Sequence, residues 1–145
     1  MKTLITGSGF TLQTDNNRVP VAAYDAEHNL FGFAIYGKKL SDTVVMQNAA
    51  SAPGDGVILP TQDYSEAILD ISISGTALVK IYGQGPGGNW YQIYGFSLTQ
   101  NAEENEITAS DLISVNCSGL QNIRASIDSV GATPGIVAVT GITIP

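Results

Sequence analysis

Side chains that could carry chemistry are few in this chain and far apart in sequence. Cys117 is the only cysteine and His28 the only histidine among the 145 residues. A catalytic thiol needs a base such as histidine beside it, and a zinc site needs several Cys or His ligands at regular spacing. Cys117 lies in the alternating run ISVNCSG, which indicates a small buried strand residue. We therefore expect a protein that is not an enzyme and has no catalytic residue, cofactor or metal.

The acidic run AEENEI, with Glu103, Glu104 and Glu106, is a second place for metal chemistry. Carboxylates bind calcium, but this run lacks the spaced Asp, Asn and Gly residues of a dedicated calcium loop. A solvated acidic loop accounts for it, and cation binding stays open. The glycine-rich segments GSG and GQGPGG lack the following Lys-Ser/Thr of a phosphate-binding loop.

An aromatic stretch, GQGPGGNWYQIYG from Gly83 to Gly95, allows two interpretations. On a continuous strand one face holds Trp90, Gln92, Tyr94, Phe96 and Leu98. This face is apolar except at Gln92, which favours core packing with Trp90 as an anchor. The alternative is an exposed platform for a sugar, made of Tyr82, Tyr91 and Tyr94. A cross-strand pair of Tyr82 and Tyr91 near the loop is a further arrangement, and it needs no ligand.

Composition and charge favour a small-residue, strand-rich domain. Hydrophobic residues make up 43% of the chain and charged residues 13%, and the net charge is −7. Such an acidic chain is a poor binder of nucleic acid, because phosphate contacts need Lys and Arg. Residues 1–42 hold four basic and four acidic side chains, whereas residues 43–145 hold two basic and nine acidic ones. This division indicates two segments with different surroundings.

Alternation of apolar and polar residues predicts the elements that position these side chains. The runs SEAILDISIS, ALVKIYG, DLISVNCSGL and QNIRASIDS each alternate with period two, and turn residues recur about every ten positions. We predict an all-β fold, an antiparallel two-sheet β-sandwich of jelly-roll or Ig-like type with little or no helix. The expected interior residues are Leu69, Ile71, Val79, Ile81, Trp90, Val115, Ile123 and Ile127.

Two glycines mark expected local features of this sandwich. Gly75-Thr76 separates two strand patterns by two residues, which is a hairpin signal. Gly141 interrupts the last strand, GIVAVTGITIP, and indicates a bulge.

Residues 1–42 are expected to form an extended N-terminal arm or a small hairpin attachment, and residues 43–145 the sandwich domain. Within the arm, RVPVAAYD and LFGFAIYG are short candidate strands around the turn AEHN. No signal peptide and no membrane-spanning run is seen, so we expect assembly in a cytoplasm and no membrane partner.

The order of motifs resembles a β-sandwich found in virion proteins of tailed bacteriophages, many of them head decoration or head-fibre proteins. The matching segments are Ile71–Gly75, Val79–Gly83, Gly87–Trp90, Ile113–Ile127 and Gly135–Gly141. The resemblance covers about 100 residues by order of motifs and departs from the family at GQGPGG, where Asp more often precedes Gly.

This resemblance implies a head decoration protein that binds the outside of the major capsid lattice and stabilises it. Its location would be the capsid surface of the virion, after assembly in the host cytoplasm. It implies a homo-oligomer, with a trimer favoured, and faces around Ile142 and Ile144 would supply contacts. A carbohydrate-binding module and a tail or baseplate component are the alternatives.

The neutral arm would be the tether, because it carries four of the six basic residues and apolar groups spaced for strand addition. The alternative is that residues 1–42 complete the sandwich with an edge strand. The capsid-contact candidates are Val19, Val21, Phe31, Phe33, Ile35, Tyr36, Lys38 and Lys39.

Overall fold

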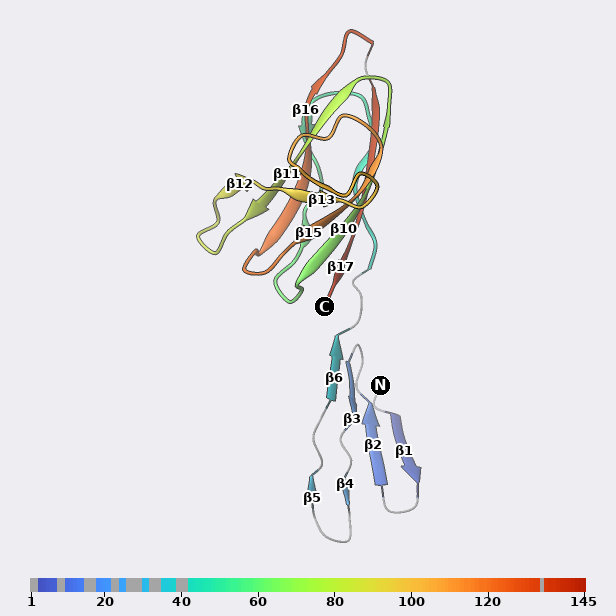
Figure 1. The fold of residues 1–145 in the computed structure, drawn as a ribbon. Coiled ribbons are helices and arrows are strands. Elements are labelled where there is room, and N and C mark those ends of the chain that lie inside the picture. Colours follow the sequence, from blue (N-terminus) through green and yellow to red (C-terminus); the bar gives the residue numbers. More distant parts are fainter. Residues whose placement is uncertain are drawn as a thin grey trace. The chain divides into compact units, whose positions relative to one another are not determined.

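The chain divides into two compact units, residues 1–39 and residues 40–145, each built of strands (Figure 1). The structure, a computed structural model, describes residues 42–133 and 135–145 in full. Before residue 42 it describes the backbone of six strand segments. No helix occurs in these described segments, as the sequence predicted.

The N-terminal unit consists of short antiparallel strands. They are β1 (Thr3–Gly7), β2 (Phe10–Thr14), β3 (Arg18–Val21), β4 (Tyr24–Asp25), β5 (Leu30–Phe31) and β6 (Ile35–Lys38). One sheet has the order β1-β2-β4-β5, and β3 pairs with β6 in a second sheet. The candidate strands RVPVAAYD and LFGFAIYG therefore contain paired strands, β3 with β6 and β4 with β5.

A six-stranded sheet forms one layer of the sandwich, in the order β14-β13-β15-β10-β17-β7. Its strands are β7 (Val44–Ala50), β10 (Glu66–Ser74), β13 (Gly95–Ser97), β14 (Ala102–Glu104), β15 (Asp111–Asn116) and β17 (Ile136–Ile144). Every pairing in it is antiparallel.

The opposing layer has the order β12-β11-β16-β8, with β9 also pairing with β16. Its strands are β8 (Gly54–Asp55), β9 (Leu59–Pro60), β11 (Ala77–Gln84), β12 (Trp90–Gln92) and β16 (Asn122–Val130). Figure 1 shows β11 and β16 on the side of the sandwich opposite β10 and β17.

The core lies between the two layers and is supplied by alternate residues, which confirms the predicted two-sheet sandwich. Seven of the eight expected interior residues are buried, with no more than 3% of their surface exposed. They are Leu69, Ile71, Val79, Ile81, Val115, Ile123 and Ile127. Met46, Leu59 and Ile107 complete the core from short or irregular segments.

Trp90 is the exception, and the predicted face of its strand is wrong. The chain from residue 90 to 98 is two short strands in different sheets, β12 and β13, rather than one continuous strand. Trp90 is half-buried on the outer surface, and Phe96 and Leu98 are 39% and 48% exposed. Gly95 and Ser97 face the core instead.

The expected hairpin at Gly75-Thr76 is also wrong in its pairing. Gly75 does turn the chain, with φ at 89°, which suits glycine. However, β10 pairs with β15 and β17, and β11 pairs with β12 and β16. The turn therefore carries the chain from the six-stranded sheet to the five-stranded sheet. Each of the two strands then buries one face in the core between the sheets.

Gly141 has a packing role, and the expected bulge lies beside it. The pairing of β17 with β10 runs without interruption through Gly141, and the irregularity toward β7 falls between Val137 and Thr140. A Cβ at Gly141 would come within 2.9 Å of Leu59 Cδ2 and within 3.0 Å of Leu69 Cδ2. Glycine thus allows close packing of the two layers there.

Candidate functional site

A cluster of aromatic and charged side chains lies on the outer face of the five-stranded sheet. Tyr82 on β11 is the register partner of Arg124 on β16. Two residues further along β11, Gln84 is the register partner of Trp90 on β12. The guanidinium carbon of Arg124 lies 4.4 Å from the centre of the Trp90 ring and 5.6 Å from that of Tyr82. Both distances are in the range of cation–π attraction.

Arg124 is also held by an ion pair. Its Nη1 lies 2.8 Å from Asp55 Oδ2 on β8, and the other oxygen of Asp55 accepts a hydrogen bond from Ser126 Oγ at 2.7 Å. Arg124 Nε is buried and has no hydrogen-bond partner among the described residues. The aromatic rings and Asp55 thus surround this cation, and contacts of Arg124 join four strands, β8, β11, β12 and β16.

Lys80 is the other cation of the sandwich domain, on the same outer face. Its Nζ lies 3.1 Å from Asp128 Oδ2 and 3.6 Å from Glu106 Oε1. The hydrogen bond to Asp128 raises the pKa of Lys80 above its ordinary value, although desolvation opposes it. The charges of Asp128 and Glu106 raise it further. Both basic groups of residues 43–145 are thus engaged by carboxylates on this sheet.

The three tyrosines proposed as a sugar platform do not share one face. Tyr82 is the register partner of Gln92, and Tyr91 is the partner of Gly83. Since neighbouring positions of a strand point to opposite faces, Tyr82 and Tyr91 are not a cross-strand pair. Tyr91 and Tyr94 are 60% and 62% exposed, at the hairpin and at the corner where the chain changes sheets.

Asp111 is the most enclosed carboxylate of the described residues, 6% exposed at the start of β15. It accepts hydrogen bonds from Thr99 Oγ1 at 2.6 Å, Ser97 Oγ at 2.7 Å and the Leu112 amide at 2.7 Å. Burial raises the pKa of this carboxyl, but the hydrogen bonds outweigh it and the net pKa is lowered. The donors are the last residue of β13, the turn that follows it and the adjacent backbone, so the cluster holds that turn in place.

The remaining candidates for chemistry lie apart. Cys117 is fully buried, and desolvation, with the charge of Glu66, raises the pKa of its thiol to about 12. In the acidic run, Glu103 and Glu104 belong to β14, and Glu106 faces Lys80. Within residues 42–133 and 135–145, no group of three His, Cys, Asp or Glu side chains is placed to hold a metal ion. His28 lies outside the described residues.

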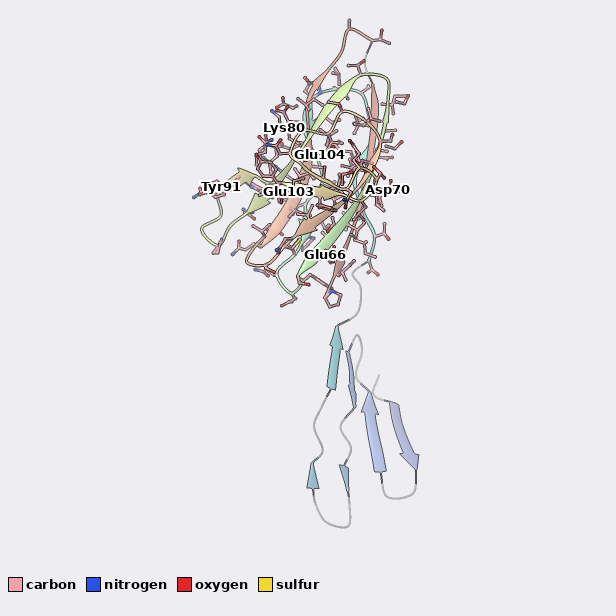
Figure 2. All side chains as sticks on the ribbon, viewed as in Figure 1. Glu66, Asp70, Lys80, Tyr91, Glu103 and Glu104 are labelled. Carbon is pink, nitrogen blue, oxygen red and sulfur yellow. The ribbon has the colours of Figure 1, made fainter. Side chains whose placement is uncertain are left out.

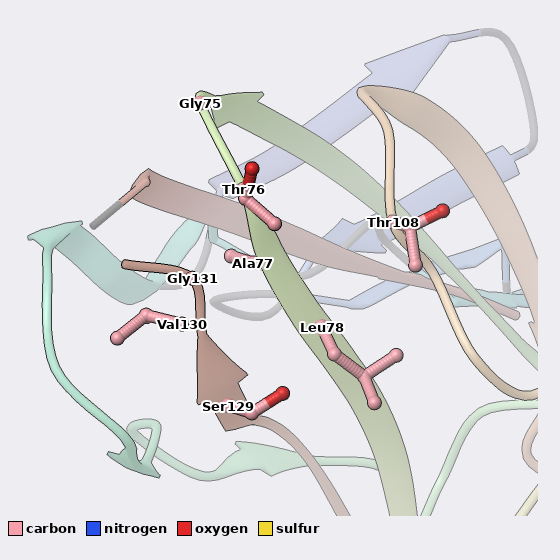
Figure 3. Close-up of a pocket in the computed structure, with 8 residues that line it drawn as sticks. All are labelled: Gly75, Thr76, Ala77, Leu78, Thr108, Ser129, Val130 and Gly131. Carbon is pink, nitrogen blue, oxygen red and sulfur yellow. The ribbon is translucent and has the colours of Figure 1, made fainter. Parts of the chain in front are cut away.

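One shallow hollow of about 290 Å³ lies where β11 begins and β16 ends (Figure 3). Its polar groups are hydroxyls, from Thr76, Thr108 and Ser129, and the rest of its lining is glycine or aliphatic. No charged side chain lines it. The hollow therefore offers little to orient a ligand.

The capsid-contact candidates fall in the N-terminal unit. Val19 and Val21 lie on β3, paired in register with Gly37 and Ile35 of β6. Phe31 is on β5, and Tyr36 and Lys38 are on β6, where Lys38 is the partner of Arg18. Phe33 and Lys39 lie outside the described residues. The pairing of β3 with β6 uses backbone groups of both strands. In the strand-addition hypothesis, such groups would instead bind a strand of the capsid protein.

Comparison with solved structures identifies proteins of the same fold. The crystal structure of the SPBc2 prophage-derived protein YomS superposes with a TM-score of 0.64 at 17% identity, over 77% of this chain and 99% of that one. The crystal structure of the PBSX exported protein XepA superposes with a TM-score of 0.66 at 18% identity. That match covers 72% of this chain but 37% of XepA, so this chain spans about a third of its length. No protein-family model and no curated protein matches the sequence.

The structural neighbours are thus phage-derived proteins, in keeping with the resemblance seen in the sequence. At these identities the likeness establishes a shared β-sandwich fold. No helix among the described residues is long and apolar enough to cross a membrane.

Sequence reasoning missed the role of Arg124 entirely. Its partners Asp55, Tyr82 and Trp90 come from three other strands. The available signal was that Arg124 is the only arginine of the sandwich domain and occupies an outward position of an alternating strand.

Proposed function

We propose that this protein is a non-enzymatic structural component of a phage particle, a head decoration protein. It would bind the outside of the major capsid lattice and stabilise it. The observation that carries the proposal is the fold shared with a prophage-derived protein over nearly the whole of that protein's length. A protein that binds only the assembled shell stabilises that shell by mass action, without any chemistry.

In this proposal the N-terminal unit is the tether. It carries four of the six basic side chains of the chain, and Arg18 lies opposite Lys38 on paired strands. The sandwich has a large excess of acidic groups and would be repelled by an acidic particle surface, whereas residues 1–39 hold four basic and three acidic side chains. Many copies bound to one lattice would then act together, so modest affinity for each site suffices.

Copies of the protein would also contact one another and form a trimer. A trimer matches the symmetry of the three-fold axes of a capsid lattice, around which the copies would attach. Sedimentation equilibrium of the full chain tests this part alone. A monomer at all concentrations, without self-contact on particles, contradicts it.

The test of attachment compares the full chain with a variant that lacks residues 1–39, added to purified phage particles that lack the protein. Circular dichroism first checks that the shortened variant folds. Imaging of labelled protein then shows whether the full chain binds heads or tails, and quantitative blotting gives copies per particle. We expect head binding by the full chain and loss of occupancy in the variant. Tail binding, or undiminished occupancy of the variant, contradicts the head role or the tether respectively.

A further inference from the structure

The outer face of the six-stranded sheet carries two rows of largely apolar side chains, with Ser114, Asp70 and Thr140 among them. Phe96 on β13 is opposite Ser114 on β15, which is opposite Ile68 on β10, which is opposite Ile142 on β17. A second row begins at Leu98 and Leu112, whose backbones are hydrogen-bonded. It continues through Asp70 and Thr140 and ends at Val45. Phe96, Leu98, Leu112 and Val45 are 37–50% exposed, and Ile68 and Ile142 are half-buried. Isolated apolar residues are normal on a surface, but rows across several strands indicate an interaction surface.

The edges of this sheet are poorly suited to a partner, which directs binding to the face. On one edge, β14 has three residues and two of them are glutamates. On the other edge, the pairing of β7 is irregular and Ala49 has a positive φ of 50°. Short, charged and irregular edge strands oppose the addition of a further strand.

Charge on this face has one sign only. Asp70 is exposed and is the register partner of Leu112. Glu103, on the edge strand β14, is the register partner of Phe96. Glu66 lies beside Ile144, and its carboxylate accepts a hydrogen bond from Ser114 Oγ at 2.5 Å. Lys80 and Arg124, the two cations of the domain, lie on the opposite sheet in ion pairs. Figure 2 shows Lys80 apart from Glu66 and Asp70.

We propose that this apolar, acid-bordered face docks a protein surface that carries apolar groups among Lys and Arg side chains. The inference rests on the proposed function, and the partner would be a protein of the particle. Charge complementarity selects this occupant, because basic groups would find three unneutralised carboxylates around an apolar centre. A second copy docked through the same face would bring carboxylates against carboxylates. For the same reason we assign self-contact to another part of the chain than Ile142 and Ile144.

The experiment measures binding of full-length variants to purified phage particles that lack the protein. Phe96→Ser removes apolar contact, with Leu98→Ser as a second variant in case the first is unstable. Tyr91→Ser is the matched control, since Tyr91 is 60% exposed and lies on β12 of the other sheet. Glu103→Lys reverses a charge on the face, and Glu104→Lys makes the same change on the next residue, which points to the other side of β14.

We expect Phe96→Ser and Leu98→Ser each to weaken the Kd about tenfold, as for a contact near the centre of an interface. Glu103→Lys should weaken it by a similar factor and should flatten its dependence on NaCl between about 50 and 500 mM. The variants Tyr91→Ser and Glu104→Lys should bind as the unchanged protein does.

Equal binding by all variants overturns the inference and leaves the proposed function intact. Failure of the unchanged protein to bind particles overturns both. If Phe96→Ser lowers the oligomer mass in sedimentation and leaves particle binding unchanged, the face is a self-contact and the inference is wrong.

Discussion

At the scale of single residues, Trp90 acts as a cover for a cation and not as a core anchor. Its ring lies 4.4 Å from the guanidinium of Arg124 and stays half-buried. We expect Trp90→Ala to lower the free energy of unfolding by about 1–2 kcal/mol, the size of a partly desolvated cation–π contact with some lost packing. A core tryptophan would cost about 3–5 kcal/mol. Urea unfolding measures the difference, and Tyr91→Ala, at a 60% exposed position, is the control with little effect.

Asp111 gives the sandwich a dependence on pH. Hydrogen bonds from Thr99, Ser97 and the backbone hold its pKa below the ordinary value of 3.8 in the folded state. The ionised carboxyl therefore stabilises the fold above that value, and the contribution is lost as the pH falls through the lower folded pKa. We expect Asp111→Asn to lose about 1–3 kcal/mol at neutral pH, as for a buried acceptor removed from its donors.

The difference between Asp111→Asn and the unchanged protein should shrink in urea unfolding curves as the pH is lowered below 3.8. Thr99→Val keeps the carboxyl and removes one donor, so it should move this loss of stability toward the ordinary pKa. A difference that stays constant with pH would show that the ionised carboxyl is not what stabilises the turn.

At the scale of elements, Gly95 lets β13 lie close to β15. A Cβ there would collide with Ile113 Cγ2 and would meet Ile81 Cδ1 and the carbonyl of Ser114 at 3.4 Å. We expect Gly95→Ala to lower the free energy of unfolding by about 1–3 kcal/mol, the cost of overpacking a core. In Gly87→Ala the nearest atom would be 3.9 Å away, so this control should unfold close to the unchanged protein. Equal midpoints for the two variants would contradict the close packing of β13.

Periodicity predicted the long strands well because each has one face on the core and one in solvent. The interior positions of β10, β11, β15 and β16 follow directly from that alternation. It failed from Trp90 to Leu98, where the chain changes sheets at Tyr94 and the buried face changes with it. An alternating pattern alone does not reveal such a break, although a glycine within an aromatic run is a physical sign of close packing.

The candidate sites were less predictable than the strands, because their members meet only through pairing between distant segments. Arg124 reaches Asp55 across a separation of about seventy residues, and Phe96 joins Ile68 and Ile142 only through the register of four strands. Counting charges predicted an acidic sandwich correctly. It gave no sign that both cations lie on one sheet and leave the other face acidic and apolar.

At the scale of the whole molecule, the sandwich should be stable without the N-terminal unit. Every residue of its described core lies between Val44 and Val139, and the strand pairings of both its layers stay within residues 44–144. We therefore expect a chain of residues 40–145 to unfold in one cooperative step, as single domains of this size do. Its loss of stability should be below about 1 kcal/mol, a change in Tm of less than about 4–8 °C.

Calorimetry of the full chain and of residues 40–145 measures this, with Gly95→Ala in both backgrounds as the matched change. If the two units are independent, Gly95→Ala should lower the Tm by the same amount in the full chain and in residues 40–145. Effects of two changes add when the changed parts of the protein share no packing. A shortened chain that melts far lower, or a substitution whose effect depends on residues 1–39, would mean that the N-terminal unit completes the sandwich. Loss of particle binding on deletion would then report unfolding rather than loss of a tether.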